Sequence, residues 1–128
     1  MFEDLSSGEL GEKIVAQWLK SRGYEIKHHR WRCRWGEIDL IAYDRSSNTL
    51  VFVEVKTRSS NNWDEGGLNA INSEKQEKIY RTAELFLSKH PHLAESFCRF
   101  DVALVKRIKN LSEEEFVIKD YLENAFEF

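Results

Sequence analysis

The chain has 128 residues, of which 41% are hydrophobic and 32% are charged, and its formal net charge at pH 7 is -3. One domain over residues 1–128 is expected, because a chain of this length buries enough surface to fold without a disulfide or structural zinc. The negative charge argues against a protein that binds nucleic acid over its whole surface. It leaves room for a local basic face or a metal site that meets phosphate.

The cysteine spacing and the absence of long apolar runs indicate the compartment. Cys33 and Cys98 lack C-x-x-C spacing, which is typical of a reducing environment rather than of a zinc site or a disulfide framework. The opening MFEDLSSGEL has no apolar core of the kind found in signal peptides, and no apolar run approaches the roughly 18 residues of a membrane span. We therefore expect a cytoplasmic protein without a membrane partner.

The first expected element is a helix within SSGELGEKIVAQWLKSRGY. Ser6 and Glu9 have the spacing of a capping box, and Gly23 suits the position just after a helix end. An apolar stripe follows helical spacing through Leu10, Ile14, Val15, Trp18 and Leu19. Glu12 lies about half a turn from Ile14, so periodicity alone predicts a solvated side chain.

Three strands are expected next. They are YEIKHHRW at 24–31, GEIDLIAY at 36–43 and TLVFVEVK at 49–56, with the turn cluster DRSSN before the third. Alternation in the second strand puts Ile38 on the same face as Leu40, and Asp39 on the opposite face with Ile41. The second and third strands predict a hairpin, which becomes a three-stranded meander if residues 24–31 pair beside it.

A polar loop, SSNNWDEGG, separates these strands from a second helix over 73–90. Ser73 and Gln76 have capping-box spacing, and Pro91 is expected to end the helix. Its apolar stripe is Ile79, Ala83, Phe86 and Leu87.

The last two expected strands are residues 97–105 and 114–122. Asp101 lies within the first of them, where structural pairing with Arg99 or a helix end is expected rather than catalysis. The resulting order is α-β-β-β-α-β-β, in the α/β class. A helix between strands three and four permits a parallel crossover, so the sheet of about five strands is expected to be mixed.

The hairpin register brings charged residues together. With the turn centred between Ser46 and Ser47, Asp39 faces Glu54 across the two strands, and Lys56 lies two residues further on the same face. Opposed carboxylates repel, so either an exposed face neutralises them or a cation binds between them. Oxygen donors of this kind suit Mg²⁺, which keeps water and substrate phosphate as its other ligands. The residues alone leave both interpretations open.

These motifs resemble the PD-(D/E)xK nuclease core. GEIDLIAYD, LVFVEVKTR, the GELGEKIVAQWLKSRGY helix, EKQEKI and ENAF are similar to a YraN-type family, itself similar to archaeal Holliday-junction resolvases. The resemblance covers nearly the whole chain. It implies a restriction-endonuclease-like fold, metal-assisted hydrolysis of DNA, including branched DNA, and a homodimer.

The resemblance also implies residue roles. Asp39 and Glu54 would hold Mg²⁺ or Mn²⁺, helped by the Val55 carbonyl. The other implied catalytic residues are Lys56 as the catalytic lysine, Glu12 as the first-helix acid and Gln76 on the second helix.

One block of the sequence combines basic and aromatic residues without an acid. The segment KHHRWRCRW at 27–35 suits phosphate contact and base stacking, although its tryptophans would equally serve a core. The residues expected to contact nucleic acid are Lys27, Arg30, Trp31, Arg32, Arg34 and Arg58. The alternative to a nuclease is a non-catalytic nucleic-acid-binding or assembly module that keeps the fold. Trp31 and Phe126 are candidate exposed aromatics for a dimer interface.

Overall fold

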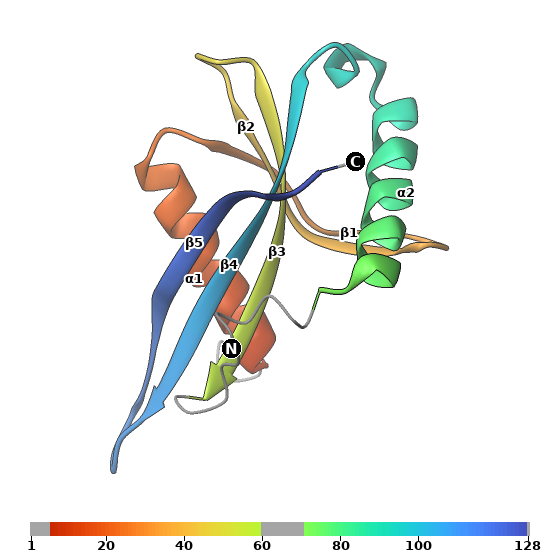
Figure 1. The fold of residues 1–128 in the computed structure, drawn as a ribbon. Helices are drawn as coiled ribbons and strands as arrows, with labels where there is room; N and C mark the ends of the chain where they lie inside the picture. The colour runs from red at the N-terminus through yellow and green to blue at the C-terminus, as the bar shows by residue number, and fades with distance from the viewer. Residues whose placement is uncertain (1–5, 60–70, 128) are drawn as a thin grey trace.

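A computed structural model describes residues 6–59 and 71–127. The elements are α1 (Ser7–Ser21), β1 (Glu25–Cys33), β2 (Gly36–Asp44), β3 (Thr49–Ser59), α2 (Ser73–Lys89), the short 3₁₀ helix η3 (Pro91–Leu93), β4 (Phe97–Lys109) and β5 (Glu114–Phe126) (Figure 1). This confirms the expected order. The expected loop at 59–67 lies outside the described residues, apart from Ser59. No helix in the described ranges is long and apolar enough to cross a membrane.

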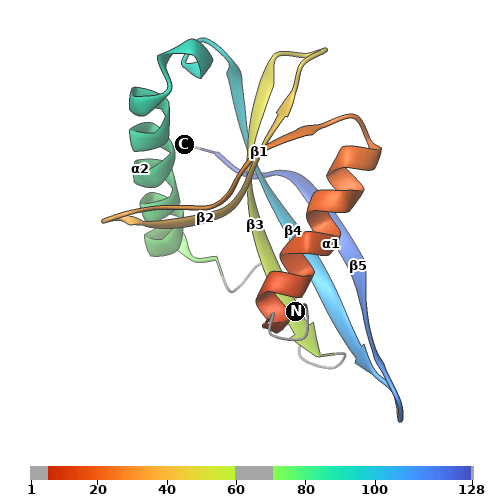
Figure 2. The ribbon, with the colours of Figure 1, turned by 180° about the vertical axis from the view of Figure 1, so that it is seen from behind.

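The strands form one mixed sheet in the order β1-β2-β3-β4-β5. β3 and β4 are parallel and joined through α2, whereas the other neighbouring pairs are antiparallel. The expected parallel crossover is therefore confirmed. Seen from the front and from behind, α1 lies along β3 to β5, and α2 lies beside the far end of the β1–β2 hairpin (Figures 1 and 2).

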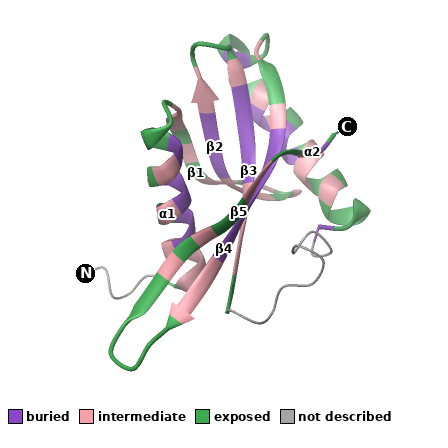
Figure 3. Cartoon of the chain, turned by 60° about the vertical axis from the view of Figure 1, so that its left-hand side comes forward, coloured by how far each residue is buried: buried purple, intermediate pink, exposed green. Residues whose placement is uncertain are grey.

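Alternation along β3 separates two cores, one on each face of the sheet. Val51 and Val53 pack under α1 with Leu19, whereas Phe52 packs on the other face with Phe86 of α2. Buried residues gather on the central strands β2, β3 and β4 (Figure 3). A strand buried on both faces reads as a continuous apolar run, which explains the sequence LVFV at 50–53.

Two apolar side chains, Ile38 and Phe126, differ from their predicted positions. Ile38 packs in the α2-side core with Ile41, not with Leu40, because the β1–β2 hairpin twists away from the sheet beyond Leu40. Phe126 is 9% exposed and stacks on Phe100, so it is not an exposed dimer contact.

Helix α1 begins and ends as expected. Ser6 and Glu9 form the capping box. Gly23 has φ +94°, and its N–H donates to the Lys20 carbonyl while that of Tyr24 donates to the Leu19 carbonyl, which is a Schellman motif.

A glycine lets α1 approach β3 closely. A Cβ atom on Gly11 would lie 2.2 Å from Thr57 Oγ1, so only glycine fits this crossing without a shift. The contact holds the next residue, Glu12, against the sheet.

The start of α2 corrects one prediction. The N-cap is Asn72, whose side chain accepts from the Lys75 N–H, and Ser73 is already helical. The predicted Ser73–Gln76 capping box is therefore wrong. Asn is as good a cap as Ser, so the two positions cannot be told apart by composition. The helix ends at Lys89, before Pro91, as expected.

Asp101 has the structural role that the sequence predicted. Its carboxylate is fully buried and accepts two hydrogen bonds from Arg99 at 2.9 Å. It also accepts from the Tyr121 hydroxyl at 2.7 Å and the Asn124 N–H at 2.9 Å. This network fastens β5 to β4 by satisfying a buried charge.

Candidate functional site

The candidate site lies where β2 and β3 separate. Their ladder runs from Asp44–Thr49 to Leu40–Val53, and these pairs are the ones that a turn centred between Ser46 and Ser47 gives, so the predicted turn register is confirmed. The ladder ends one residue before the predicted Asp39–Glu54 pair. Beyond it β2 turns toward α2 while β3 continues along the sheet (Figures 1 and 2). We call this divergence the fork.

Asp39 reaches across the fork to β3. Its Oδ2 accepts a hydrogen bond from the Val55 N–H at 2.8 Å. A strand residue directs its N–H and C=O to the same side, so the Val55 carbonyl also faces the fork. The carboxylate and the carbonyl thus lie at a place where the regular strand pairing has stopped.

Three acids near the fork each have a cation. Glu54 Oε2 lies 3.6 Å from Lys56 Nζ, and both side chains are mostly buried, at 20% and 14% exposed. The other two pairs are Glu12 with Arg30 and Glu37 with Arg32, each at 2.8 Å. Asp39 has no ion-pair partner within 6–59 or 71–127. It is the uncompensated acid of the group.

The electrostatics of Asp39 reflect that isolation. Burial, and then the neighbouring Glu54 carboxylate, raise the pKa of Asp39 to about 8, while the Val55 N–H opposes the shift. Burial also raises the pKa of Glu54, although the Lys56 ammonium and a hydrogen bond with Asp39 oppose it. The pair therefore tends to keep a proton at neutral pH unless a cation binds.

Glu12 is buried, contrary to its helical periodicity. It is 8% exposed and receives two hydrogen bonds from Arg30, at 2.8 and 3.1 Å. Arg30 has φ +50°, an uncommon backbone conformation for a residue other than glycine. The position of Glu12 is consistent with the family-derived expectation that it lies near the site, since its charge also raises the pKa of Asp39.

The donors at the fork fit a hard divalent cation. Asp39, Glu54 and the Val55 carbonyl supply oxygen, the ligand type that Mg²⁺ and Mn²⁺ prefer. No group of three or more His, Cys, Asp or Glu side chains in the described part of the chain is arranged as a metal site. A cation here would therefore rely on two carboxylates, a carbonyl and water.

The first turns of α2 border the same place. A hollow of about 160 Å³ is lined by Trp35, Gly36, Glu37, Glu54, Lys75, Lys78, Ile79 and Thr82. Gln76, the implied helix glutamine, donates from its side-chain amide to the Ile71 carbonyl at 3.2 Å. Lys75 and Lys78 were not predicted as site residues, because lysines on an exposed helix face give no distinguishing signal.

The basic segment is mostly engaged within the molecule. Lys27 pairs with Glu25 at 3.2 Å, and Arg34 lies over the Trp35 ring at 4.6 Å. Trp31 packs edge-on against Phe86, the arrangement expected of a core tryptophan. Arg58 is exposed on β3 two residues beyond Lys56. Arg34 and Arg58 are exposed and form no ion pair within residues 6–59 and 71–127, so they are available to phosphate, whereas Arg30 and Arg32 would first have to leave their acids.

Known proteins similar to this chain identify its family. The model of the Uncharacterised protein family UPF0102 matches residues 11–105. A UPF0102 protein of Synechococcus sp. is 48% identical over 95% of this chain and 90% of its own length. A UPF0102 protein of Nostoc sp. is 48% identical over 96% of this chain and 95% of its own length. One from Acaryochloris marina is 54% identical over 80% of this chain and 64% of its own length.

Among solved structures, Pyrococcus furiosus SfsA in complex with Ca²⁺ is 13% identical, with a TM-score of 0.36, over 90% of this chain and 60% of that protein. That likeness is too distant to bear on function. The family model and the relatives agree over most of the sequence, including the helix with Glu12, the fork and α2. The chain belongs to the UPF0102 family.

Proposed function

We propose that this protein is a metal-dependent nuclease that hydrolyses phosphodiester bonds in DNA, with branched DNA among its substrates. The observation that carries the proposal is the fork, where Asp39, which has no ion-pair partner among the described residues, lies beside the Glu54–Lys56 pair. Stability gains nothing from two buried carboxylates in contact. A site that binds a cation against phosphate explains them.

The residues divide the chemistry between them. Asp39, Glu54 and the Val55 carbonyl would hold Mg²⁺ or Mn²⁺, and the metal, when bound, would supply Lewis-acid stabilisation of phosphate charge and an acidified water. Lys56 carries its ammonium group beside Glu54, where it orients the attacking water or stabilises charge on the phosphate. Glu12 holds Arg30 in place at the edge of the site.

Cleavage assays test the proposal. Labelled linear, flapped and four-way DNA would be incubated with Mg²⁺ or Mn²⁺, and cutting should be lost, by at least about a hundredfold, in Asp39→Asn and in Lys56→Ala. Asp120→Asn and Lys89→Ala are matched controls on exposed positions and should cut normally. Cutting that survives both site substitutions would reject the assignment.

A second candidate is a module that binds nucleic acid without cutting it. Glu12 and Glu54 are already ion-paired, with Arg30 and Lys56, so these two acids are held without a metal, which favours a function without cleavage. Binding of the same DNA substrates without any cleavage, at every metal tested, would support it over the nuclease.

We also propose a homodimer, because a four-way junction presents two equivalent positions for cutting and a twofold pair of sites matches them. Sedimentation with and without a four-way DNA tests this. A species that remains monomeric on the junction would contradict it.

A further inference from the structure

We propose that Trp35 stacks against an unpaired nucleobase next to the bond that is cut, so that the substrate is DNA with a flap, gap or branch rather than continuous duplex. This inference rests on the proposed function and specifies its substrate. It comes from the position of Trp35, from the hollow that joins Trp35 to Glu54, and from two lysines that line the hollow.

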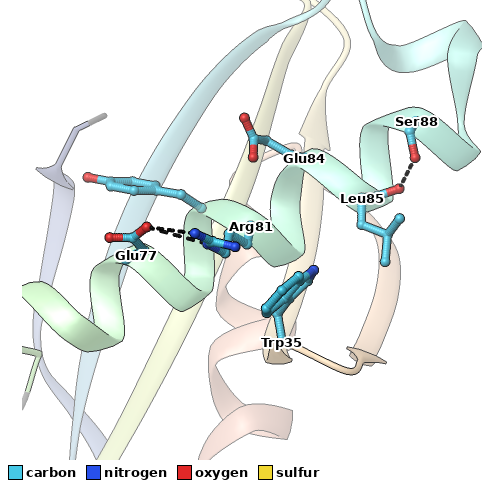
Figure 4. A pocket seen from close by; sticks show the side chains of 7 residues that line it. Trp35, Glu77, Arg81, Glu84, Leu85 and Ser88 are labelled. Atoms are coloured by element: carbon cyan, nitrogen blue, oxygen red, sulfur yellow. Dashed lines mark hydrogen bonds and ion pairs between the residues drawn. The ribbon is translucent and has the colours of Figure 1, made fainter.

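Trp35 occupies an unusual position for its residue type. Cys33 pairs with Gly36, so Arg34 and Trp35 are the two residues of a tight turn between β1 and β2. Such turns favour Asn, Asp and Gly, and tryptophan has no advantage there. Turn formation therefore does not explain the tryptophan. The indole lies against the exposed side of α2, near Arg81 and Leu85 (Figure 4).

Two hollows border Trp35. Trp35 lines a broad hollow of about 660 Å³ with residues of α2 from Glu77 to Ser88. It also lines the hollow of about 160 Å³ that Glu54 lines. One aromatic ring thus borders both the surface of α2 and the proposed metal ligands. A strand whose phosphate lies at Glu54 would bring an adjacent base to Trp35.

The charges in the smaller hollow suit that strand. Lys75 and Lys78 line it, and neither has an ion-pair partner in the part of the chain that the structure describes. The positive charge of Lys75 is near enough to lower the pKa of Glu54. Ammonium groups without an acid partner are ready to contact phosphate.

Two arginines now cover the indole. The Arg34 and Arg81 guanidinium carbons lie 4.6 and 4.7 Å from the ring centroid, and both side chains are exposed. An exposed cation–π contact is weaker than the stacking of a base on an aromatic side chain. Arg81 is also ion-paired with Glu77, so a base would displace the Arg34 guanidinium, which is then free to contact the phosphate of the same nucleotide.

The geometry also selects against continuous duplex. A paired base inside a duplex already has a neighbour on each face, and exposing a face requires unstacking. A flap, gap or branch point provides that face at little cost. The stacking partner is thus a reason for the site to prefer unpaired bases.

Binding without cutting tests the inference. Anisotropy of labelled DNA would be measured in EDTA at one salt concentration, comparing a flapped duplex with a fully paired duplex of the same length. Wild type should prefer the flapped DNA. Trp35→Ala and Trp35→Leu should lose about tenfold in affinity for it and stay within about twofold on the duplex, while Trp35→Phe keeps most of the preference.

Matched variants control for unrelated effects. Phe97→Ala removes another exposed aromatic, 71% exposed, at the end of β3 and β4 away from Glu54, and should bind like wild type. Lys75→Ala with Lys78→Ala should weaken both DNAs and lower the salt dependence of binding. Thermal melting of each variant identifies any loss of fold, and the leucine variant retains an apolar side chain should alanine unfold the turn.

The outcomes separate this inference from the proposed function. If Trp35→Ala binds flapped DNA as tightly as wild type does, or loses affinity equally for flapped and fully paired DNA, the stacking role is rejected even where the protein cuts DNA. If the flap preference depends on Trp35 but no substrate is cut at any metal tested, the nuclease is rejected and the stacking site stands.

Discussion

At the scale of single residues, Asp39 has the most unusual electrostatic environment of the acids at the fork. It is the acid at the fork without a cation in the described residues, and its contacts are the Val55 N–H and the Glu54 carboxyl. Each neighbouring acid has a cationic partner, which lowers the free-energy cost of burying its charge, and Asp39 lacks this compensation. The metal-free protein therefore keeps a proton on this buried pair of acids at neutral pH, and the negative charge of Asp39 becomes costly as the pH rises toward 8.

The raised pKa of Asp39 predicts a pH dependence of folding. The pKa of Asp39 is about 8 in the folded protein, above its ordinary 3.8, so the folded state binds more protons and this group's contribution falls as pH rises from about 4 to about 8. Asp39→Asn keeps an oxygen for Val55 and should stabilise the metal-free protein by about 1–3 kcal/mol at pH ~8, with little gain at pH ~4.

Urea unfolding in EDTA at both pH values measures the difference between variant and wild type, which cancels the other titrating groups. Asp120→Asn, on exposed β5, is the control. An equal gain at the two pH values would show that ionisation of Asp39 is not the cause.

At the scale of elements, close contact between α1 and β3 positions Glu12. Gly11 sits against Thr57, whose Oγ1 is buried without a hydrogen-bond partner in the described residues. The periodicity of α1 placed Glu12 on a solvated face, because it describes the helix alone. The contact with β3 and the reach of Arg30 from β1 decide that Glu12 is buried.

Gly11→Ala should therefore destabilise the protein by about 1–3 kcal/mol, although alanine is the better helix former. Gly8→Ala is the matched control in the same helix, because its Cβ would come no closer than 3.7 Å to a neighbour, and it should be neutral or stabilising. Thr57→Ala should recover part of the loss in the Gly11→Ala background. Additive effects of the two substitutions in urea unfolding would contradict the contact.

The start of α2 gives a second prediction at this scale. Asn72→Ala should cost about 1 kcal/mol, because its side chain caps the Lys75 N–H, whereas Ser73→Ala should change stability by only a few tenths. Urea unfolding of both variants decides between the two caps. A larger loss from Ser73→Ala would restore the cap that the sequence favoured.

At the scale of the whole molecule, topology brings the site together. α2 is the crossover between the parallel strands β3 and β4, so its first turns lie beside the end of β3 that carries Glu54 and Lys56. The β1–β2 hairpin leaves the sheet at the fork and carries Asp39 and Trp35 with it (Figures 1 and 2). Residues from β2, β3, α2 and the turn before β2 thus surround one region.

A cation at the fork should stabilise the whole fold. Mg²⁺ or Mn²⁺ at about 100 times its dissociation constant adds about 2.7 kcal/mol by mass action, which appears as a rise in melting temperature. Asp39→Asn and Glu54→Gln should lose most of this rise, while Asp120→Asn keeps it. Thermal melting against metal concentration measures the effect, and an identical rise in all four proteins would place the bound metal elsewhere.

The sequence by itself determined the order of elements, the mixed sheet, the register of the β2–β3 hairpin and the nearness of Asp39 to Glu54 and Lys56. These follow from residue alternation, helical periodicity and turn composition, which are local in the chain. Only the tertiary structure decided that Trp31 packs against Phe86 while Trp35 lies on α2, that Glu12 is buried with Arg30, and that Lys75 and Lys78 line the hollow at Glu54. Those outcomes depend on sheet twist and on packing between distant segments, which no local pattern encodes.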